Sequence, residues 1–108
     1  MKRIMDIDTL NTALIENDDF RKMFDRRWKE ESLYKILADN FYIIGDDNKV
    51  YEVEECYSPD ADRTFIMKQE FFDFDSDEGE APKLEFVNWY FGEPNADTTE
   101  RYLRKESE

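Results

Sequence analysis

The chain has 108 residues, a length that fits a single domain over residues 1–108. Apolar residues make up 40% of it and aromatic residues 16%, which argues against intrinsic disorder although 40% of the residues are charged. The net charge of −13 disfavours direct binding to nucleic acid or to an anionic membrane, because both require positive charge.

Targeting features do not stand out in the sequence. It contains no run of about 18 apolar residues, so we expect no membrane span. The N-terminus, MKRIMDIDTL, lacks the long apolar segment of a signal peptide. Cys56 is the single cysteine and cannot form an internal disulfide, so we expect a cytoplasmic protein.

The N-terminal third predicts helices. Apolar residues at helical spacing predict a first helix over 8–17, with Asp8 or Thr9 as its N-cap. A second apolar stripe predicts a helix over about 19–38. The register of this stripe shifts at a kink or a break near 30–32. Ser32 can cap the helical segment that follows.

The apolar period then changes to two, which predicts strands. These run over 41–44, 49–57, 63–74 and 83–91. The short, turn-rich connections between them favour an antiparallel meander. Strict alternation puts Phe86 and Tyr90 on one face of the last strand, opposite Trp89. Both faces of that strand are apolar, so we expect it to be central or covered on both sides.

A short last helix is predicted over 98–106, because Asp97 and Glu100 have the spacing of a capping box. The predicted fold class is therefore α+β. N-terminal helices pack on one face of a roughly four-stranded antiparallel sheet, and a short C-terminal helix follows.

The negative charge is concentrated in the later part of the chain. Residues 1–40 contain eight Lys and Arg against nine Asp and Glu. Residues 41–100 contain four against seventeen, and residues 101–108 contain three against two. The predicted sheet therefore carries the whole excess, which favours a basic protein partner.

Several kinds of catalytic chemistry lack their residues. The chain has no histidine, which removes the usual general base and the commonest zinc ligand. Its three glycines are isolated, so no phosphate-cradling loop can be built from them. A carboxylate pair could catalyse glycoside hydrolysis, but in so acidic a chain such pairs have little specificity. We predict that the chain is not an enzyme and needs no cofactor.

The segment FFDFDSDEGE, residues 71–80, has alternating aspartates like the first ligands of a calcium loop. The pattern then fails, because such a loop requires glycine at the position of Glu78 and glutamate at the position of Leu84. We predict no metal site. One interpretation is a solvated hairpin connection, whose charges discourage edge-to-edge pairing of strands.

The other interpretation is a binding surface for a basic partner. Alternate residues on a strand lie about 6–7 Å apart on one face, similar to neighbouring phosphates on a nucleic-acid strand. The predicted partner-binding residues are Glu52, Glu54, Asp73, Asp75, Asp77, Glu78 and Glu80.

In size and charge the chain resembles small acidic inhibitors. These include phage proteins that block restriction or CRISPR nucleases, as an anti-defence measure, and immunity proteins that neutralise nuclease toxins. The resemblance implies a non-enzymatic inhibitor that occupies the nucleic-acid site of its partner, as a mimic of DNA or RNA. The alternatives are an immunity protein that plugs a toxin by shape and aromatic contacts, and a small acidic phage or bacterial interaction domain.

The second predicted helix carries a basic face. Its residues are Arg21, Lys22, Arg26, Arg27 and Lys29. We expect a solvated face whose charges pair with nearby acids. Alternatively, these cations could meet the acidic sheet of a second copy and form a homodimer.

Overall fold

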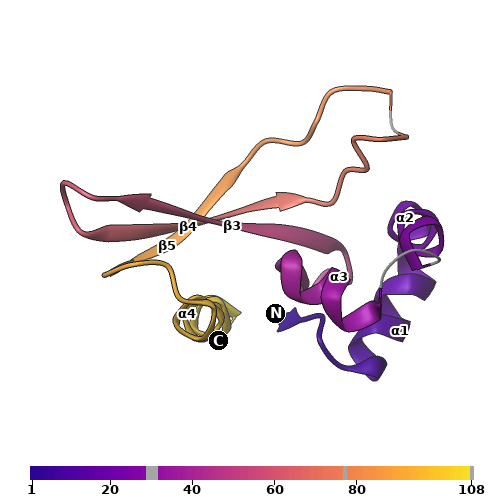
Figure 1. Cartoon of the computed structure of the whole chain (residues 1–108), viewed down its shortest axis with the longest axis horizontal. Helices are drawn as coiled ribbons and strands as arrows, with labels where there is room; N and C mark the ends of the chain where they lie inside the picture. The colour runs from indigo at the N-terminus through magenta and orange to yellow at the C-terminus, as the bar shows by residue number, and fades with distance from the viewer. Residues whose placement is uncertain (29–31, 77, 108) are drawn as a thin grey trace.

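The structure is a computed structural model that describes residues 1–28, 32–76 and 78–107. Its helices are α1 (Ile7–Glu16), α2 (Asp18–Trp28), α3 (Leu33–Asp39) and α4 (Ala96–Ser107). Its strands are β1 (Lys2–Arg3), β2 (Tyr42–Ile44), β3 (Val50–Ser58), β4 (Arg63–Glu70) and β5 (Glu85–Phe91). The predicted α+β fold with a short C-terminal helix is confirmed (Figure 1).

The cap of α1 differs from the predicted one. Asp6, rather than Asp8 or Thr9, is the N-cap, and its carboxylate accepts hydrogen bonds from Thr9 N at 2.9 Å and Thr9 Oγ1 at 2.8 Å. The first bond satisfies a backbone donor that has no partner within the first turn. The helix ends where predicted, because the N–H of its C-cap Asn17 still donates to the Ala13 carbonyl at 3.0 Å.

The predicted helix over 19–38 is divided into α2 and α3. The division agrees with the predicted break, although residues 30 and 31 lie outside the described part of the chain. Ser32 caps α3, and its hydroxyl accepts the Lys35 N–H at 3.3 Å. The predicted serine cap is therefore confirmed.

The sheet is an antiparallel meander with the order β1-β2-β3-β4-β5. The predicted meander is confirmed, and β1 adds a strand to the four predicted from periodicity. With two residues, β1 is too short to have a recognisable period.

The sheet separates two apolar cores. Tyr42 and Ile44 of β2 pack with Phe20 of α2 in one core, whereas Ile43 between them packs with Leu103 of α4 in the other. Successive side chains on a strand point to opposite faces, so the two cores lie on opposite faces of the sheet. Figure 1 shows α1, α2 and α3 at one end of the sheet and α4 beneath the strands. The N-terminal helices and α4 therefore pack on opposite faces of the sheet.

β5 is the last strand in the sheet order, so the prediction that this strand is central or covered on both sides is wrong. Its buried side chains, Val87 and Tyr90, belong to the core beneath α4. Phe86 and Phe91 remain 56% and 67% exposed. Apolar side chains on both faces of β5 therefore do not indicate that this strand is central in the sheet.

A β-bulge in β5 changes which of its side chains share a face. Phe86 pairs with Met67 and Trp89 pairs with Phe65, two positions away on β4, so both β5 aromatics point to the same face. The register shift leaves Val87 as an extra residue between these pairs. Strict alternation predicted Phe86 and Trp89 on opposite faces, and the bulge overturns that prediction.

Polar groups fasten α4 to the sheet. The Thr99 hydroxyl donates to a Glu55 carboxylate oxygen at 2.6 Å and lies 2.9 Å from the Tyr90 hydroxyl. The Asn95 N–H donates to the same Tyr90 hydroxyl at 2.9 Å. Thr99 is fully buried, so these bonds satisfy groups that solvent cannot reach.

α4 begins before the predicted position. The Asn95 side-chain oxygen accepts the Thr98 N–H at 3.1 Å, as an N-cap does. Asp97 lies inside the first turn instead of capping it. The predicted capping box at Asp97 is therefore wrong, because an amide upstream already satisfies this terminus.

We expect Thr99→Val to destabilise the fold by roughly 1–3 kcal/mol, because the Glu55 carboxylate loses a hydrogen bond inside the protein. Urea unfolding followed by circular dichroism measures the change. Thr98→Val is the control, because it makes the same substitution at the neighbouring residue. Equal unfolding midpoints for the two variants would show that the network contributes no stability.

Candidate functional site

The structure places the predicted partner-binding acids on β3 and on the connection between β4 and β5. Glu52 and Glu54 lie on β3 and share a face of the sheet, as predicted from their spacing. The remaining acids lie within residues 71–84, of which Asp77 is outside the described residues.

Asp73 is a structural residue rather than part of the exposed surface. It is only 4% exposed, and both of its carboxylate oxygens lie 3.0 Å from Arg26 Nη2 of α2. It also accepts hydrogen bonds from Ser76 Oγ at 2.6 Å and from Asp75 N at 3.2 Å. Burial raises the pKa of Asp73, but the hydrogen bonds from Ser76 and Arg26 outweigh burial and lower that pKa below its usual range.

Arginines of α2 also reach the next acid of the connection. Asp75 is exposed, yet its carboxylate lies 3.7 Å from Arg26 and 4.0 Å from Arg27. The expected pairing of the basic helix face with local acids holds for Arg21, which lies 3.4 Å from Asp18, but not for the pairs that Arg26 and Arg27 form here. The acids come from the distant β4–β5 connection, which the sequence alone did not identify.

Glu52 lies close to this cluster. It lines a small pocket of about 130 Å³ together with Asp73, Asp75 and Arg27. Burial and the neighbouring Glu54 carboxylate raise the pKa of Glu52, and Arg27 opposes them. The fold therefore holds Glu52 where its ionised form is disfavoured.

Two carboxylates with opposite pKa shifts resemble an acid–base pair, but the arrangement does not favour catalysis. The pocket is smaller than the roughly 300–1,000 Å³ of sites that bind small molecules. The Asp73 oxygens are already occupied by Arg26 and Ser76. Among the described residues, no three Asp, Glu, Cys or His side chains form a group that could hold a metal ion.

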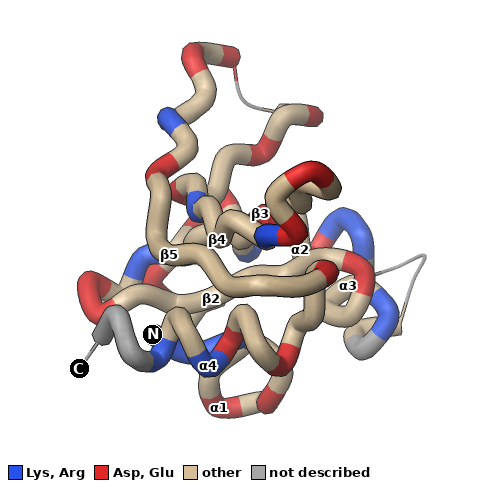
Figure 2. The backbone as a smooth tube through the Cα atoms, turned by 90° about the vertical axis from the view of Figure 1, so that its left-hand side faces the viewer, with Lys and Arg blue, Asp and Glu red and all other residues tan. Residues whose placement is uncertain are grey.

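The remaining acids are more accessible. Glu54, Glu78 and Glu80 are exposed. Figure 2 shows acidic positions on the β4–β5 connection and also on α1, at the opposite end of the molecule. Because Asp73 is buried and Glu52 is half-buried, the six predicted acids within the described residues do not form one continuous exposed field. Glu54, Asp75, Glu78 and Glu80 are the described ones that are exposed.

A second exposed surface lies outside the predicted partner-binding acids. It lies on the sheet face opposite α4, at the end away from α1–α3, and we call it the open face. The residues of the open face are Cys56, Arg63, Phe65, Met67, Phe86, Trp89 and Phe91. The Arg63 guanidinium stacks over Trp89, 4.3 Å from the ring centroid. The bulge adds Phe86 to this surface, and alternation alone could not reveal that addition.

Glu54 borders the open face. It pairs directly with Met67, which in turn pairs with Phe86, so these residues form one row across three strands. An exposed carboxylate therefore stands beside an exposed aromatic ring.

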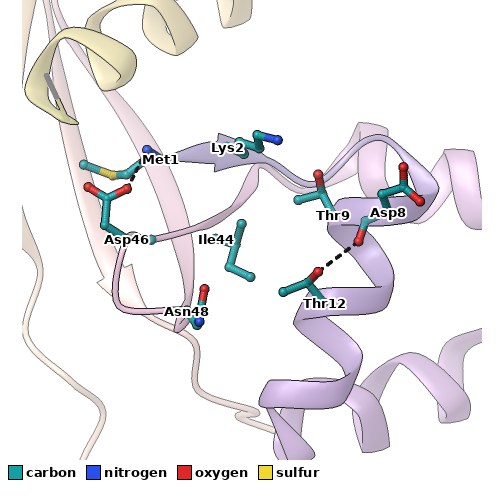
Figure 3. Close-up of a pocket in the computed structure, with 9 residues that line it drawn as sticks. Met1, Lys2, Asp8, Thr9, Thr12, Ile44, Asp46 and Asn48 are labelled. Atoms are coloured by element: carbon teal, nitrogen blue, oxygen red, sulfur yellow. Dashed lines mark hydrogen bonds and ion pairs between the residues drawn. The ribbon is translucent and has the colours of Figure 1, made fainter.

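A larger pocket, of about 490 Å³, lies between β1, α1 and the turn that joins β2 to β3 (Figure 3). Two bonds link groups of its lining: the Met1 ammonium lies 3.2 Å from Asp46, and the Thr12 hydroxyl donates to the Asp8 carbonyl at 3.1 Å. Lys2 and Asp8 give its lining both signs of charge. The pocket shows no preference for one class of ligand.

Comparisons with protein-family models, curated proteins and solved structures found no match to this chain. Within residues 1–28, 32–76 and 78–107, no helix has the length and apolar character needed to cross a membrane.

We expect Asp73→Asn to destabilise the fold by roughly 1–3 kcal/mol at neutral pH, because Arg26 loses its charged partner. The pKa of Asp73 is lowered on folding, so its stabilisation exists above the ordinary Asp pKa of about 3.9 and disappears as the pH falls through the lowered value. Urea unfolding of both proteins should show a stability gap that closes in acid. Asp39→Asn, at an exposed site on α3, is the control. A gap that persists in acid would contradict this role of the Asp73 charge.

Glu52→Gln should increase stability at neutral pH. The pKa of Glu52 is raised on folding, so the ionised carboxylate opposes folding, and this penalty vanishes below the ordinary Glu pKa of about 4.3. Thermal unfolding at neutral and acidic pH measures the difference, with Glu80→Gln as the exposed control. A Glu52→Gln variant that is less stable than the parent at neutral pH would refute this.

Proposed function

We propose that this chain is a non-enzymatic acidic inhibitor, which binds a basic, nucleic-acid-handling protein and blocks its nucleic-acid site. One observation carries the proposal: exposed carboxylates project from β3 and from the β4–β5 connection of a chain whose net charge is −13. The contact residues would be Glu54, Asp75, Glu78 and Glu80, with Glu52 at their margin.

The anchor at Asp73 supports this proposal. Its pair with Arg26 fixes the start of the connection against α2, and Asp75 lies two residues further along. An acidic segment that is held in place loses less conformational freedom on binding than a free one. Negative potential around it would also accelerate encounter with a basic partner.

The spacing of Glu52 and Glu54 is compatible with mimicry of a nucleic-acid strand. Their separation on one strand face is about 6–7 Å, comparable to that of successive phosphates. The arginines of α2 reduce the charge near Asp73 and Asp75, so the outer acids Glu54 and Glu80 would carry most of the attraction.

A second function is favoured by the open face. Exposed aromatic side chains are common anchors of protein interfaces. An immunity protein could use Phe86, Trp89 and Phe91 to plug the active site of a toxin, with charge only assisting. Such binding would depend little on salt, whereas an electrostatic mimic would weaken steeply as ionic strength rises.

The proposal is tested by capturing a partner from a cell lysate on the immobilised chain and purifying it. We expect a nucleic-acid-handling protein whose affinity for the chain falls as salt rises. Glu54→Lys combined with Glu80→Lys should slow association roughly tenfold or more at low salt. The control, Glu16→Lys with Asp39→Lys, makes the same change in net charge on α1 and α3. Equal rates for the two double variants would show that the proposed acids have no specific role.

A further inference from the structure

The outer edge of β5 ends the sheet in the described part of the chain. A strand at a sheet edge presents backbone N–H and C=O groups that a further strand can pair with. Along this edge the side chains of the open face are aromatic, with Phe86 and Phe91 more than half exposed. The Trp89 N–H already donates to Asn88 Oδ1 at 2.8 Å, so an added strand must displace this local bond or pair on either side of it. The rest of β5 offers both backbone groups for pairing and apolar side chains for packing.

The bulge determines how these aromatics are arranged. Without it, alternation would direct Phe86 toward α4, away from Trp89 and Phe91. With it, all three rings lie on one face, where Trp89 and Phe91 are 4.9 Å apart between centroids. A strand added beside β5 would place every second side chain next to this row of rings.

Charge determines which segment fits this edge. Exposed Glu93 stands at one end of the apolar run of β5, and exposed Glu85, which lies 4.0 Å from Lys68, stands at the other. Glu54 borders the open face beside Met67. A second copy of this chain is disfavoured, because two molecules with a charge of −13 each repel one another. Lysine or arginine at the ends of the added segment would complement these acids.

We propose that β5 accepts an extended segment of a partner protein, apolar in its middle and basic at its ends, as a sixth strand of the sheet. The backbone of the segment pairs with β5, and its apolar side chains pack on Phe86, Trp89 and Phe91. This inference rests on the β5 edge and the open face, and it does not depend on the inhibitor proposal.

The test is an NMR titration of the isotopically labelled chain with a synthetic peptide of alternating valine and threonine that has lysines at both ends. We expect shifts of the amide signals over Glu85–Phe91 and of the Trp89 indole N–H, together with slower amide exchange on β5. The same peptide with glutamates at its ends should bind at least several-fold more weakly.

Phe86→Ser combined with Phe91→Ser should weaken peptide binding roughly tenfold, because two exposed rings lose their contacts. The control is Ile15→Ser with Phe74→Ser, which removes side chains that are 77% and 65% exposed outside the open face. Absence of shifts on β5, or equal binding of the lysine and glutamate peptides, would overturn the proposal. Self-association of the free chain that the Phe86 and Phe91 substitutions abolish would overturn it in favour of a second copy. Because no nucleic-acid-handling protein takes part, the result is separate from the test of inhibition.

Discussion

The ion pair between Arg26 and Asp73 is the contact on which the position of the acidic connection depends. It joins α2 to the segment that leaves β4, and it buries a carboxylate that the sequence alone would place in solvent. The neighbouring Phe71 packs edge-to-face on Phe20 of α2, with ring centroids 5.3 Å apart. A charged contact and an aromatic contact thus fix the start of the connection, and the acids beyond it project from a defined place.

The molecule offers two surfaces with different physical character. The acids of β3 and the connection act through long-range attraction, which salt weakens. The open face acts through apolar contact, which requires close fit and depends little on salt. Glu54 lies where the two surfaces meet, since it is exposed and pairs with Met67 of the open face. A single partner with an apolar centre and a basic rim could contact both surfaces, as many protein interfaces do.

Much of the fold could be predicted from periodicity, because the elements other than the two-residue β1 lie in segments long enough to reveal a period. The change from helical spacing to alternation identified the order of elements, and Ser32 identified the start of α3. The faces of β5 could not be predicted, because one inserted residue at Val87 reverses the alternation and leaves no mark in the sequence. The face of the sheet that α4 covers could not be predicted either, because the apolar stripe of α4 fits either face equally well.

The candidate site could be predicted only in part. The spacing of Glu52 and Glu54 correctly placed both on one strand face. The fate of Asp73 could not be deduced, because its partner Arg26 is 47 residues away and no local pattern links them. A run of acids in the sequence therefore contained both a buried anchor and exposed charges, and only the tertiary contacts distinguish them.

The most direct measurement of the inhibitory role is competition for the captured partner between this chain and a fluorescently labelled oligonucleotide, followed by fluorescence anisotropy. If the acidic surface occupies the nucleic-acid site, increasing amounts of the chain release the oligonucleotide completely, and excess oligonucleotide raises the apparent dissociation constant of the chain. A stable complex that holds the partner, the chain and the oligonucleotide together would contradict that role.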